Sequence, residues 1–439
     1  MTNKERKELA QWAINKAIQN NANEVSVDIT NRREIEIEYR DKKLDKLKES
    51  TQNSLTIDIY VDNKFSSQNT NDLRKSSLET FISEAVKSTE YLTKDEFRAL
   101  PDPKYYPDNL NVPLKINDEN YQQLSSEQRV KLAKEIEETA MGMSDKIIST
   151  TSGYRDTYYE TVKINSNGFE GNSKGTMFSA GAEVTVKDAD ARPEDYFYAR
   201  SRFINQLPTT EEIGKLAVER ALRKIGQEKL ESGEYTMIVE NMAVSRLVYM
   251  LLGAMYASAI QQKRSYLDGM IGEKIASDMF TLIDNPLLPQ GLSSRLYDSD
   301  GIKAEKRVMI ENGILKSYYV DNYYGKKLGL EPNGNSSTNL ILSYGSRSTE
   351  EMVKDVKKGI LVTGFIGGNS NSTTGDYSFG VSGLLVENGK TVKPVSEMNI
   401  SGNAKDLWAQ LVEVGNDPNI YSSWRMPGLM FENISFSGI

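Results

Sequence analysis

Met309-Ile-Glu-Asn-Gly313-Ile-Leu and Leu385-Val-Glu-Asn-Gly389-Lys-Thr place the same Glu-Asn-Gly tripeptide between two apolar runs. An Asn-Gly pair between apolar runs favours a two-residue hairpin turn, because both residues tolerate positive φ. The two segments therefore predict two equivalent β-hairpins, and we expect both to belong to one barrel-like sheet. Two copies are too few to indicate a solenoid of repeats.

An apolar helix is predicted between these hairpins and the N-terminal half of the chain, from Ala243 to Arg264. Its apolar residues recur so densely that almost no polar face remains, which is typical of a buried helix. The longest apolar stretch, Leu247 to Ile260, is too short and too interrupted by Tyr, Gly and Ser to span a bilayer. We expect the barrel-like sheet to surround this helix.

The N-terminal part alternates strictly between apolar and polar residues in three runs, namely 24–29, 34–39 and 54–60. This period of two predicts an antiparallel sheet with one wet face. Helical periodicity predicts flanking helices over 4–20, 72–88, 126–144 and 210–225. The fold class is therefore α+β, with an N-terminal antiparallel sheet and its helices followed by a strand-rich, barrel-like C-terminal domain.

The chain of 439 residues exceeds what one hydrophobic core usually serves. A proline-punctuated connector over 101–113 lacks any periodic pattern and ends the first unit. The turn Glu231-Ser-Gly-Glu234 follows the last helix of the second unit. We predict three units, an N-terminal α/β unit at 1–110, a central α+β unit at 111–230 and a β-rich C-terminal domain at 231–439.

The composition excludes several kinds of chemistry. The chain contains no His and no Cys, which removes the commonest metal ligands, the thiolate nucleophile and disulfides. Its net charge is -8, so the cationic field needed for nonspecific DNA binding is missing, and we expect no direct nucleic-acid partner. The N-terminus lacks the apolar run of a secretory signal, so we expect a cytoplasmic protein without a membrane segment.

A series of ordered motifs in the C-terminal part resembles the PmbA/TldE branch of the TldD/PmbA family, whose members are also described as modulators of DNA gyrase. The motifs are Ser265-Tyr-Leu-Asp-Gly, Gly272-Glu273, Asp284-Asn-Pro286, Gly291-Leu-Ser-Ser, Asp298-Ser-Asp-Gly301, Ile310-Glu-Asn-Gly-Ile-Leu-Lys316, Asn333-Gly-Asn335, Thr374-Gly-Asp-Tyr-Ser378, Val386-Glu-Asn-Gly389, Pro394-Val395, Ile400-Ser-Gly-Asn403 and Val414-Gly-Asn-Asp417. Each motif alone is weak, but their shared order is specific. Residues 1–230 fit the family's domain plan less specifically.

The resemblance implies that catalytic members bind zinc through a His-Glu-x-x-x-His helix and a later Cys. Such ligands let the metal generate hydroxide at neutral pH. The corresponding helix here carries no ligand at Val248, Leu252 or Gly253, and the segment 421–427, where the Cys would fall, has none. The resemblance thus implies a chain without catalytic residues, metal or cofactor of its own, paired with a TldD-like catalytic subunit that holds the zinc.

The segment 364–378 is rich in Gly, Ser and Thr and is predicted to be a long loop. It could line a groove in which an extended peptide adds to a sheet edge, or it could be an ordinary connection. The candidate peptide-binding residues are Gly367, Gly368, Asn369, Thr374, Gly375, Asp376 and Tyr377. No Lys-Ser/Thr pair follows at P-loop spacing, which disfavours phosphate binding.

Three further groups have an alternative structural reading. Asp298-x-Asp300-Gly301 could open a calcium loop, but the other ligands are missing and a tight turn is expected. Ser265 near Lys263, or Thr373 and Thr374 near Asp376, could form nucleophile–base pairs, yet turns and caps are expected. A set of aromatic residues could form a protein–protein surface or pack inside the barrel. These are Tyr318, Tyr319, Tyr323, Tyr324, Tyr421 and Trp424.

Three functional hypotheses follow. The first is a non-catalytic subunit of a TldD/TldE-type cytoplasmic protease, which by resemblance degrades unfolded or extended peptides, matures peptide antibiotics and affects gyrase indirectly. The second is a homo-oligomeric peptide-binding or scaffold protein without proteolysis, for which a homodimer is the simplest form. The third is an enzyme that uses carboxylates alone.

Overall fold

The computed structural model describes residues 1–439 and contains three β-sheets. The N-terminal sheet has six antiparallel strands in the order β3-β2-β1-β4-β5-β6. Its strands are β1 (Glu24–Arg40), β2 (Lys43–Val61), β3 (Lys64–Thr70), β4 (Ile147–Asn165), β5 (Glu170–Val186) and β6 (Glu194–Ser201). Because β1 pairs with both β2 and β4, this one sheet contains strands from either side of residue 110.

Strand β1 joins two of the predicted strands into one. The runs at 24–29 and 34–39 are continuous through the polar residues 30–33, which keep their pairing to β2 and β4. The turn to β2 has positive φ at Asp41 and Lys42, as a two-residue hairpin requires. Apolar residues of β1 alternate toward the helices, and Glu34, Glu36 and Glu38 occupy the opposite face.

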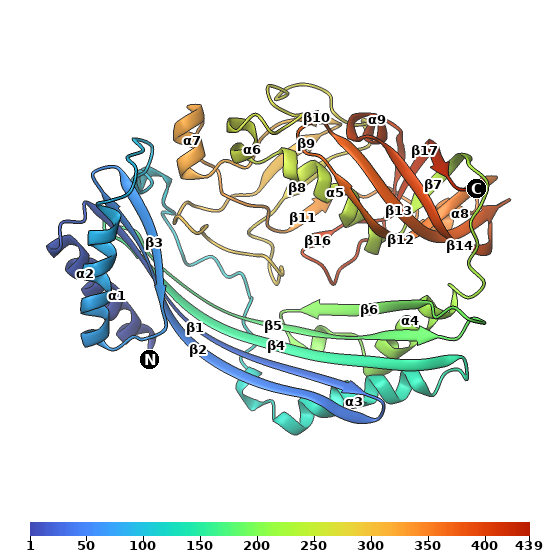
Figure 1. Ribbon diagram of the computed structural model, residues 1–439, viewed down its shortest axis with the longest axis horizontal. Helices are drawn as coiled ribbons and strands as arrows, with labels where there is room; N and C mark the ends of the chain where they lie inside the picture. Colours follow the sequence, from blue (N-terminus) through green and yellow to red (C-terminus); the bar gives the residue numbers. More distant parts are fainter.

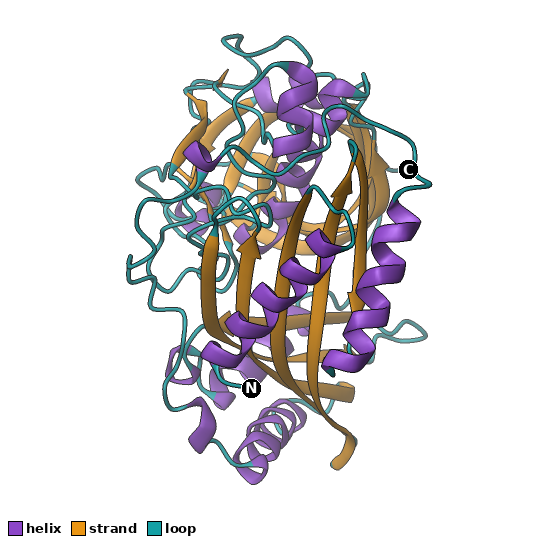
Figure 2. Ribbon diagram, turned by 90° about the vertical axis from the view of Figure 1, so that its left-hand side faces the viewer, coloured by secondary structure: helices purple, strands orange, loops and turns teal.

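Two pairs of helices cover one face of this sheet and complete two separate cores. The helices are α1 (Asn3–Gln19), α2 (Lys75–Thr89), α3 (Ser126–Met141) and α4 (Thr210–Leu222), and three short 3₁₀ turns are η1 (Pro103–Tyr105), η2 (Tyr121–Gln123) and η3 (Ile204–Gln206). Helices α1 and α2 pack on one half of the long strands, whereas α3 and α4 pack on the other. Figure 1 shows the sheet as a long curved layer, and Figure 2 shows helices covering one of its faces.

The C-terminal domain contains a closed barrel of mixed strands. Its strands are β7 (Gly233–Val239), β12 (Lys358–Ser370), β13 (Asp376–Glu387), β14 (Lys390–Asn403) and β17 (Leu429–Ser437), with β15 (Leu411–Val414) added beside β17. Strand β14 pairs with β17 as well as with β13, which closes the ring. The β12–β7 pair is parallel and the other pairs are antiparallel, so the predicted barrel-like sheet is confirmed.

A second, five-stranded sheet lies beside the barrel. It contains β8 (Leu282–Asp284), β9 (Arg307–Glu311), β10 (Ile314–Leu315), β11 (Leu340–Leu342) and β16 (Trp424–Arg425). Both Asn-Gly hairpins form with positive φ at each turn residue. One connects β9 to β10 and the other connects β13 to β14, so the prediction that they share one sheet is wrong. Local turn chemistry does not specify which sheet a hairpin joins.

The predicted apolar helix at 243–264 is two helices, and one side of it is open. Helix α5 (Asn241–Ala254) ends before Met255, and α6 (Ala257–Gln261) follows after a break. The remaining helices are α7 (Asn322–Leu328), α8 (Thr349–Val353) and α9 (Ala404–Ala409). Tyr249 in α5 is 62% exposed, so the helix is not buried on every side. No helix is both long and apolar enough to cross a membrane.

Candidate functional site

Helix α5 presents two chemically different faces. Val248 and Leu252 are buried in the largest hydrophobic core, together with Val244, Leu247 and Leu251. Arg246, Tyr249 and Gly253 follow one another at spacings of three and four residues and form the opposite face. Of the three positions singled out on this helix, only Gly253 therefore lies on the open side.

The predicted loop at 364–378 is mostly a hairpin. Strand β12 continues to Ser370 and β13 begins at Asp376, so only residues 371–375 form the turn. Strand β7 pairs with β12 only from Gly359 to Val362, and the rest of β12 pairs on one side only. The mixture of Gly and polar residues concealed this strand because it lacks the apolar alternation that predicts one.

Gly367 and Gly368 form a bulge that helix α5 holds in place. Both have positive φ, and a Cβ at Gly368 would lie 2.1 Å from the Ser378 carbonyl oxygen, so glycine is required there. Arg246 Nη2 donates to the carbonyl oxygens of Gly367 (3.3 Å) and Gly368 (3.1 Å). The Arg246 guanidinium also lies 4.8 Å from the centre of the Phe379 ring. Asn369 is exposed beside this bulge.

The hairpin tip is held by a polar turn. Thr374 Oγ1 donates to Asp376 Oδ2 (2.6 Å), and Asn403 Nδ2 donates to Asp376 Oδ1 (3.1 Å). These hydrogen bonds lower the pKa of Asp376, which makes it a poor general base for Thr374. Gly375 and Tyr377 are buried, and burial raises the pKa of Tyr377 to about 12. Gly375 and Tyr377 thus shape the hairpin from inside, whereas Gly367, Gly368, Asn369, Thr374 and Asp376 are exposed.

A groove of about 450 Å³ runs along the part of β12 that has no second neighbour. Tyr196 of β6, Arg246 of α5 and the strand residues from Thr363 to Gly367 line it. Ile366 is 54% exposed beside this groove. No sequence pattern distinguishes Tyr196 or Ile366, whereas Arg246 is the only charged side chain of α5.

The segment 421–427, where the family resemblance places a Cys, lies close to α5. The Trp424 ring stacks on Tyr249 with centroids 6.4 Å apart, and Tyr421 meets Phe197 edge to face. Tyr318 and Tyr319 belong to the core, whereas Tyr323 and Tyr324 are half-buried on α7. The aromatic set is therefore divided among the core, helix α7 and two separate contacts.

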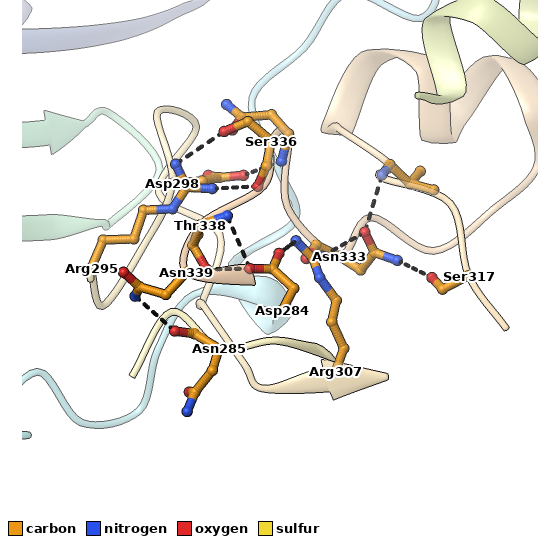
Figure 3. A network of polar contacts seen from close by, with 12 residues as sticks. Asp284, Asn285, Arg295, Asp298, Arg307, Ser317, Asn333, Ser336, Thr338 and Asn339 are labelled. Carbon is orange, nitrogen blue, oxygen red and sulfur yellow. Dashed lines mark hydrogen bonds and ion pairs between the residues drawn. The ribbon is translucent and has the colours of Figure 1, made fainter. Parts of the chain in front are cut away.

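The two remaining sequence candidates have structural roles. Asp298 Oδ1 accepts the backbone N–H groups of Asp300 (2.9 Å) and Ile302 (3.0 Å), which confirms the expected tight turn. Figure 3 shows this aspartate in a polar network that includes Asp284 paired with Arg307 (3.0 Å). Ser265 is buried, and its Oγ donates to the Ala254 carbonyl (2.5 Å) where α5 ends.

The residues of the α5 face do not fit a zinc ion. Zinc sites use imidazole, thiolate or carboxylate ligands, and Arg246, Tyr249 and Gly253 supply none of these. Nowhere in residues 1–439 do three or more His, Cys, Asp or Glu side chains form a group that could hold a metal ion. We therefore derive no reaction step through a metal in this chain.

Comparison with known proteins defines the class. Residues 232–438 match the PmbA/TldA metallopeptidase C-terminal domain, and residues 119–225 match the central domain of the same family. The chain therefore belongs to the PmbA/TldD metallopeptidase family. Within this family it falls in the PmbA branch, being 28% identical to the metalloprotease PmbA of Escherichia coli O157:H7 across 92% of this chain and 90% of that protein.

Solved structures agree with this assignment. A candidate modulator of DNA gyrase from Bacteroides thetaiotaomicron is 42% identical, and the two chains match over their full lengths with a TM-score of 0.97. TldE from Thermococcus kodakarensis shares the fold, with a TM-score of 0.87 over 98% of this chain and 100% of that chain, at 22% identity.

Proposed function

We propose that the protein is a non-catalytic, PmbA/TldE-like subunit of a cytoplasmic TldD/TldE-type protease, whose zinc-bearing subunit is a second, TldD-like chain. The observation that carries this proposal is the open face of α5. By the family resemblance this helix would correspond to the metal-binding helix of catalytic members, and Arg246, Tyr249 and Gly253 supply no zinc ligand on it. Any effect on gyrase would then be indirect, through turnover of a peptide that acts on gyrase.

We assign an extended or unfolded peptide to the groove beside β12. The unpaired edge of this strand offers main-chain groups to an added strand, and Ile366 offers apolar surface next to it. Arg246 fixes the bulge at Gly367 and Gly368, so the edge is formed before a peptide binds. In the assembled protease, this subunit would help to hold the chain that its partner cuts.

The test of the catalytic assignment compares the purified chain, a TldD-like partner and their mixture. Zinc content is measured by mass spectrometry and cleavage is followed with an unfolded peptide. We expect zinc and cleavage in the partner and the mixture, a stable complex on gel filtration, and neither zinc nor cleavage in this chain alone. Stoichiometric zinc required for hydrolysis by this chain alone would overturn the proposal. A stable homo-oligomer that does not bind the TldD-like partner would favour the scaffold hypothesis instead.

The peptide groove is tested with Ile366→Asp. Introducing a charge beside the β12 edge should weaken binding of a labelled unfolded peptide by at least fivefold in fluorescence polarisation. Val392→Asp is the matched control, because Val392 is similarly exposed at 51% but lies on β14 away from the groove. Equal weakening by both variants would assign the effect to general charge and not to the groove.

A further inference from the structure

A second hollow, of about 550 Å³, is lined by residues different from those of the β12 groove. Three parts of the molecule form its walls. These are the connector at 110–119, strands β4 and β5 through Tyr159 and residues 172–174, and the C-terminal segment 294–297. None of these residues belongs to the groove or the α5 face, so the hollow is a separate feature.

Hydrogen bonds between its walls hold the hollow open. Gln290 N–H donates to the Leu114 carbonyl (2.7 Å), which ties the connector to the C-terminal domain. Thr176 N–H donates to the Ile116 carbonyl (2.9 Å), which ties the connector to β5. The buried guanidinium of Arg202 binds the carbonyl oxygens of Gly291 and Thr176 (3.1 and 3.0 Å). The walls are therefore fixed before any ligand enters.

One side of the hollow is apolar and carries free main-chain groups. Leu110, Val112, Pro113 and Leu296 supply the apolar surface, and Val112 is 39% exposed. The carbonyl oxygens of residues 111–113 and the N–H of Val112 have no hydrogen-bond partner within the protein. Unpaired main-chain groups beside apolar side chains form a surface with which an extended peptide can pair.

The charge of the lining is positive in a protein whose net charge is -8. Lys115, Lys174 and Arg295 line the hollow, and Glu119 is the only acidic side chain among them. Glu119 pairs with Lys174 (2.9 Å), whereas Lys115 makes no ion pair or hydrogen bond through its amine. Arg295 has no carboxylate within 4.0 Å, and its Nη atoms bind only Ser336 (Figure 3).

Two buried polar atoms in these walls, Arg295 Nε and Asn117 Oδ1, also have no hydrogen-bond partner within the protein. An unpaired buried polar atom is rare in a folded protein. Burial also lowers the pKa of Arg295, because it outweighs the opposing charges of Asp298 and Asp284, neither of which forms an ion pair with it.

We propose that this hollow binds the C-terminal end of a short apolar peptide. The free carboxylate would lie between Lys115 and Arg295, and the apolar side chains would pack on Leu110, Val112 and Leu296. Main-chain hydrogen bonds to residues 111–113 favour a peptide over a small organic acid, which lacks amide groups. The inference concerns binding by this chain alone and does not depend on the proposed protease role.

The experiment uses the full chain and isothermal titration with three probes. They are acetyl-Leu-Val-Phe with a free carboxylate, the same peptide as its C-terminal amide, and 4-phenylbutyrate. We expect the free-acid peptide to bind, the amide to bind at least tenfold more weakly, and the small acid to bind at least tenfold more weakly. Equal binding of acid and amide, or no binding of the peptide at millimolar concentration, would overturn the proposal. Binding of 4-phenylbutyrate as tight as the peptide would overturn the assignment to a peptide.

Two surface variants keep the test independent of folding. Lys115→Gln removes the exposed charge, and Val112→Asp places a negative charge on the apolar side, so each should weaken the free-acid peptide by threefold or more. Val392→Asp, at an exposed residue of β14 outside both hollows, should leave this affinity unchanged. Arg295→Gln should weaken it most, but Arg295 also holds Ser336, so the two surface variants decide. Unchanged affinity in both surface variants would contradict the placement of the carboxylate and apolar side chains.

Discussion

Glu240 and Asp300 are two carboxylates at different junctions between the N-terminal sheet and the C-terminal domain, and their surroundings are opposite. Glu240, at the start of α5, pairs with Arg220 (2.8 Å) of helix α4 and with Arg223 (2.7 Å), the residue that follows this helix. The backbone carbonyl of Asp300 accepts a hydrogen bond from the side chain of Asn165 in β4 (3.1 Å). The Asp300 carboxylate has no ion pair. One junction is held by charge pairing, and the other encloses a charge that costs stability.

The pKa values of the two groups express this difference. The two arginines hold the pKa of Glu240 below its ordinary value of 4.5, although burial alone would raise it. Burial, followed by the charge of Asp298, raises the pKa of Asp300 to about 7. Charge pairing thus stabilises the junction near the β12 groove. Packing and backbone hydrogen bonds must hold the junction at Asp300.

The largest expected effect is the loss of Arg220. This guanidinium is 11% exposed and binds Glu240, Asp195 (3.3 Å) and the Thr363 carbonyl (3.3 Å), so it joins β6, α4, α5 and β12. Arg220→Met leaves Asp195 and Glu240 with one cation less and should lower the free energy of unfolding by about 3 kcal/mol. Urea denaturation measures the loss.

Lys215→Met is the matched control on the same helix. Lys215 pairs with Glu219 at 3.8 Å with both side chains more than half exposed, so its removal should cost less than about 0.5 kcal/mol. A similar loss in both variants would mean that the junction contributes no more than an exposed ion pair does.

The next effect is a gain, from Asp300→Asn. Because the folded-state pKa is about 7 and the unfolded value is 3.8, the folded protein binds the extra proton in this interval. Stability should therefore fall as pH rises from about 4 to about 7 and stay level above it. The amide removes this fall and should stabilise the protein at pH 8 by on the order of 1 to 2 kcal/mol.

The measurement is thermal unfolding of both proteins at pH 5 and pH 8. Asp108→Asn, at an exposed aspartate of the connector, should change neither curve. Glu240 has the opposite effect on the dependence of stability on pH, because its pKa is lowered in the folded protein. Its contribution to stability is present above pH 4.5 and is lost as pH falls below this value. No difference between Asp300→Asn and the parent at pH 8 would contradict the uncompensated burial of Asp300.

The sequence predicted the parts of these junctions but not their assembly. Period-two alternation located the strand residues of β1 and β2, and Asn-Gly pairs located both C-terminal hairpins, because these signals are local. The family resemblance, together with the absence of His and Cys, singles out the helix that contains Val248. Arg220 and Glu240 are in contact although they are 20 residues apart in the sequence, and Asn165 and Asp300 are 135 residues apart. No local sequence pattern predicts such contacts.

The candidate site divided in the same way. The Gly-rich composition of 364–378 predicts backbone freedom, and Gly367 and Gly368 both adopt positive φ. Tyr377 belongs to the same predicted peptide-binding set, yet it points into the core and stacks on Phe379. The free edge of β12 exists because β7 ends at Val239, and a sequence does not reveal where a partner strand stops.

Tyr323 of helix α7 makes a third contact between the N-terminal and C-terminal parts of the protein. Tyr323 of α7 donates to Asp95 (2.5 Å), while the Arg98 guanidinium lies 3.6 Å from the centre of the Tyr323 ring. Tyr323→Phe removes the hydrogen bond and keeps the ring under Arg98, so the free energy of unfolding should fall by about 1 kcal/mol. Tyr91→Phe, at a tyrosine that is 89% exposed, should have no effect.

The smallest expected effect tests whether this third contact is held by charge at all. Lys327 pairs with Asp95 at 3.0 Å, with both side chains between a fifth and a third exposed, and water screens such a pair. Lys327→Met should therefore cost about 0.5 kcal/mol or less in urea denaturation, and 1 M salt should cost the parent no more than this. A loss as large as that of Arg220→Met would show that exposed pairs bind the halves as strongly as the enclosed network of Glu240. In that case burial of the charges would not explain the difference between the junctions at Glu240 and Asp300. The stability of the junction beside the β12 groove would then need another source.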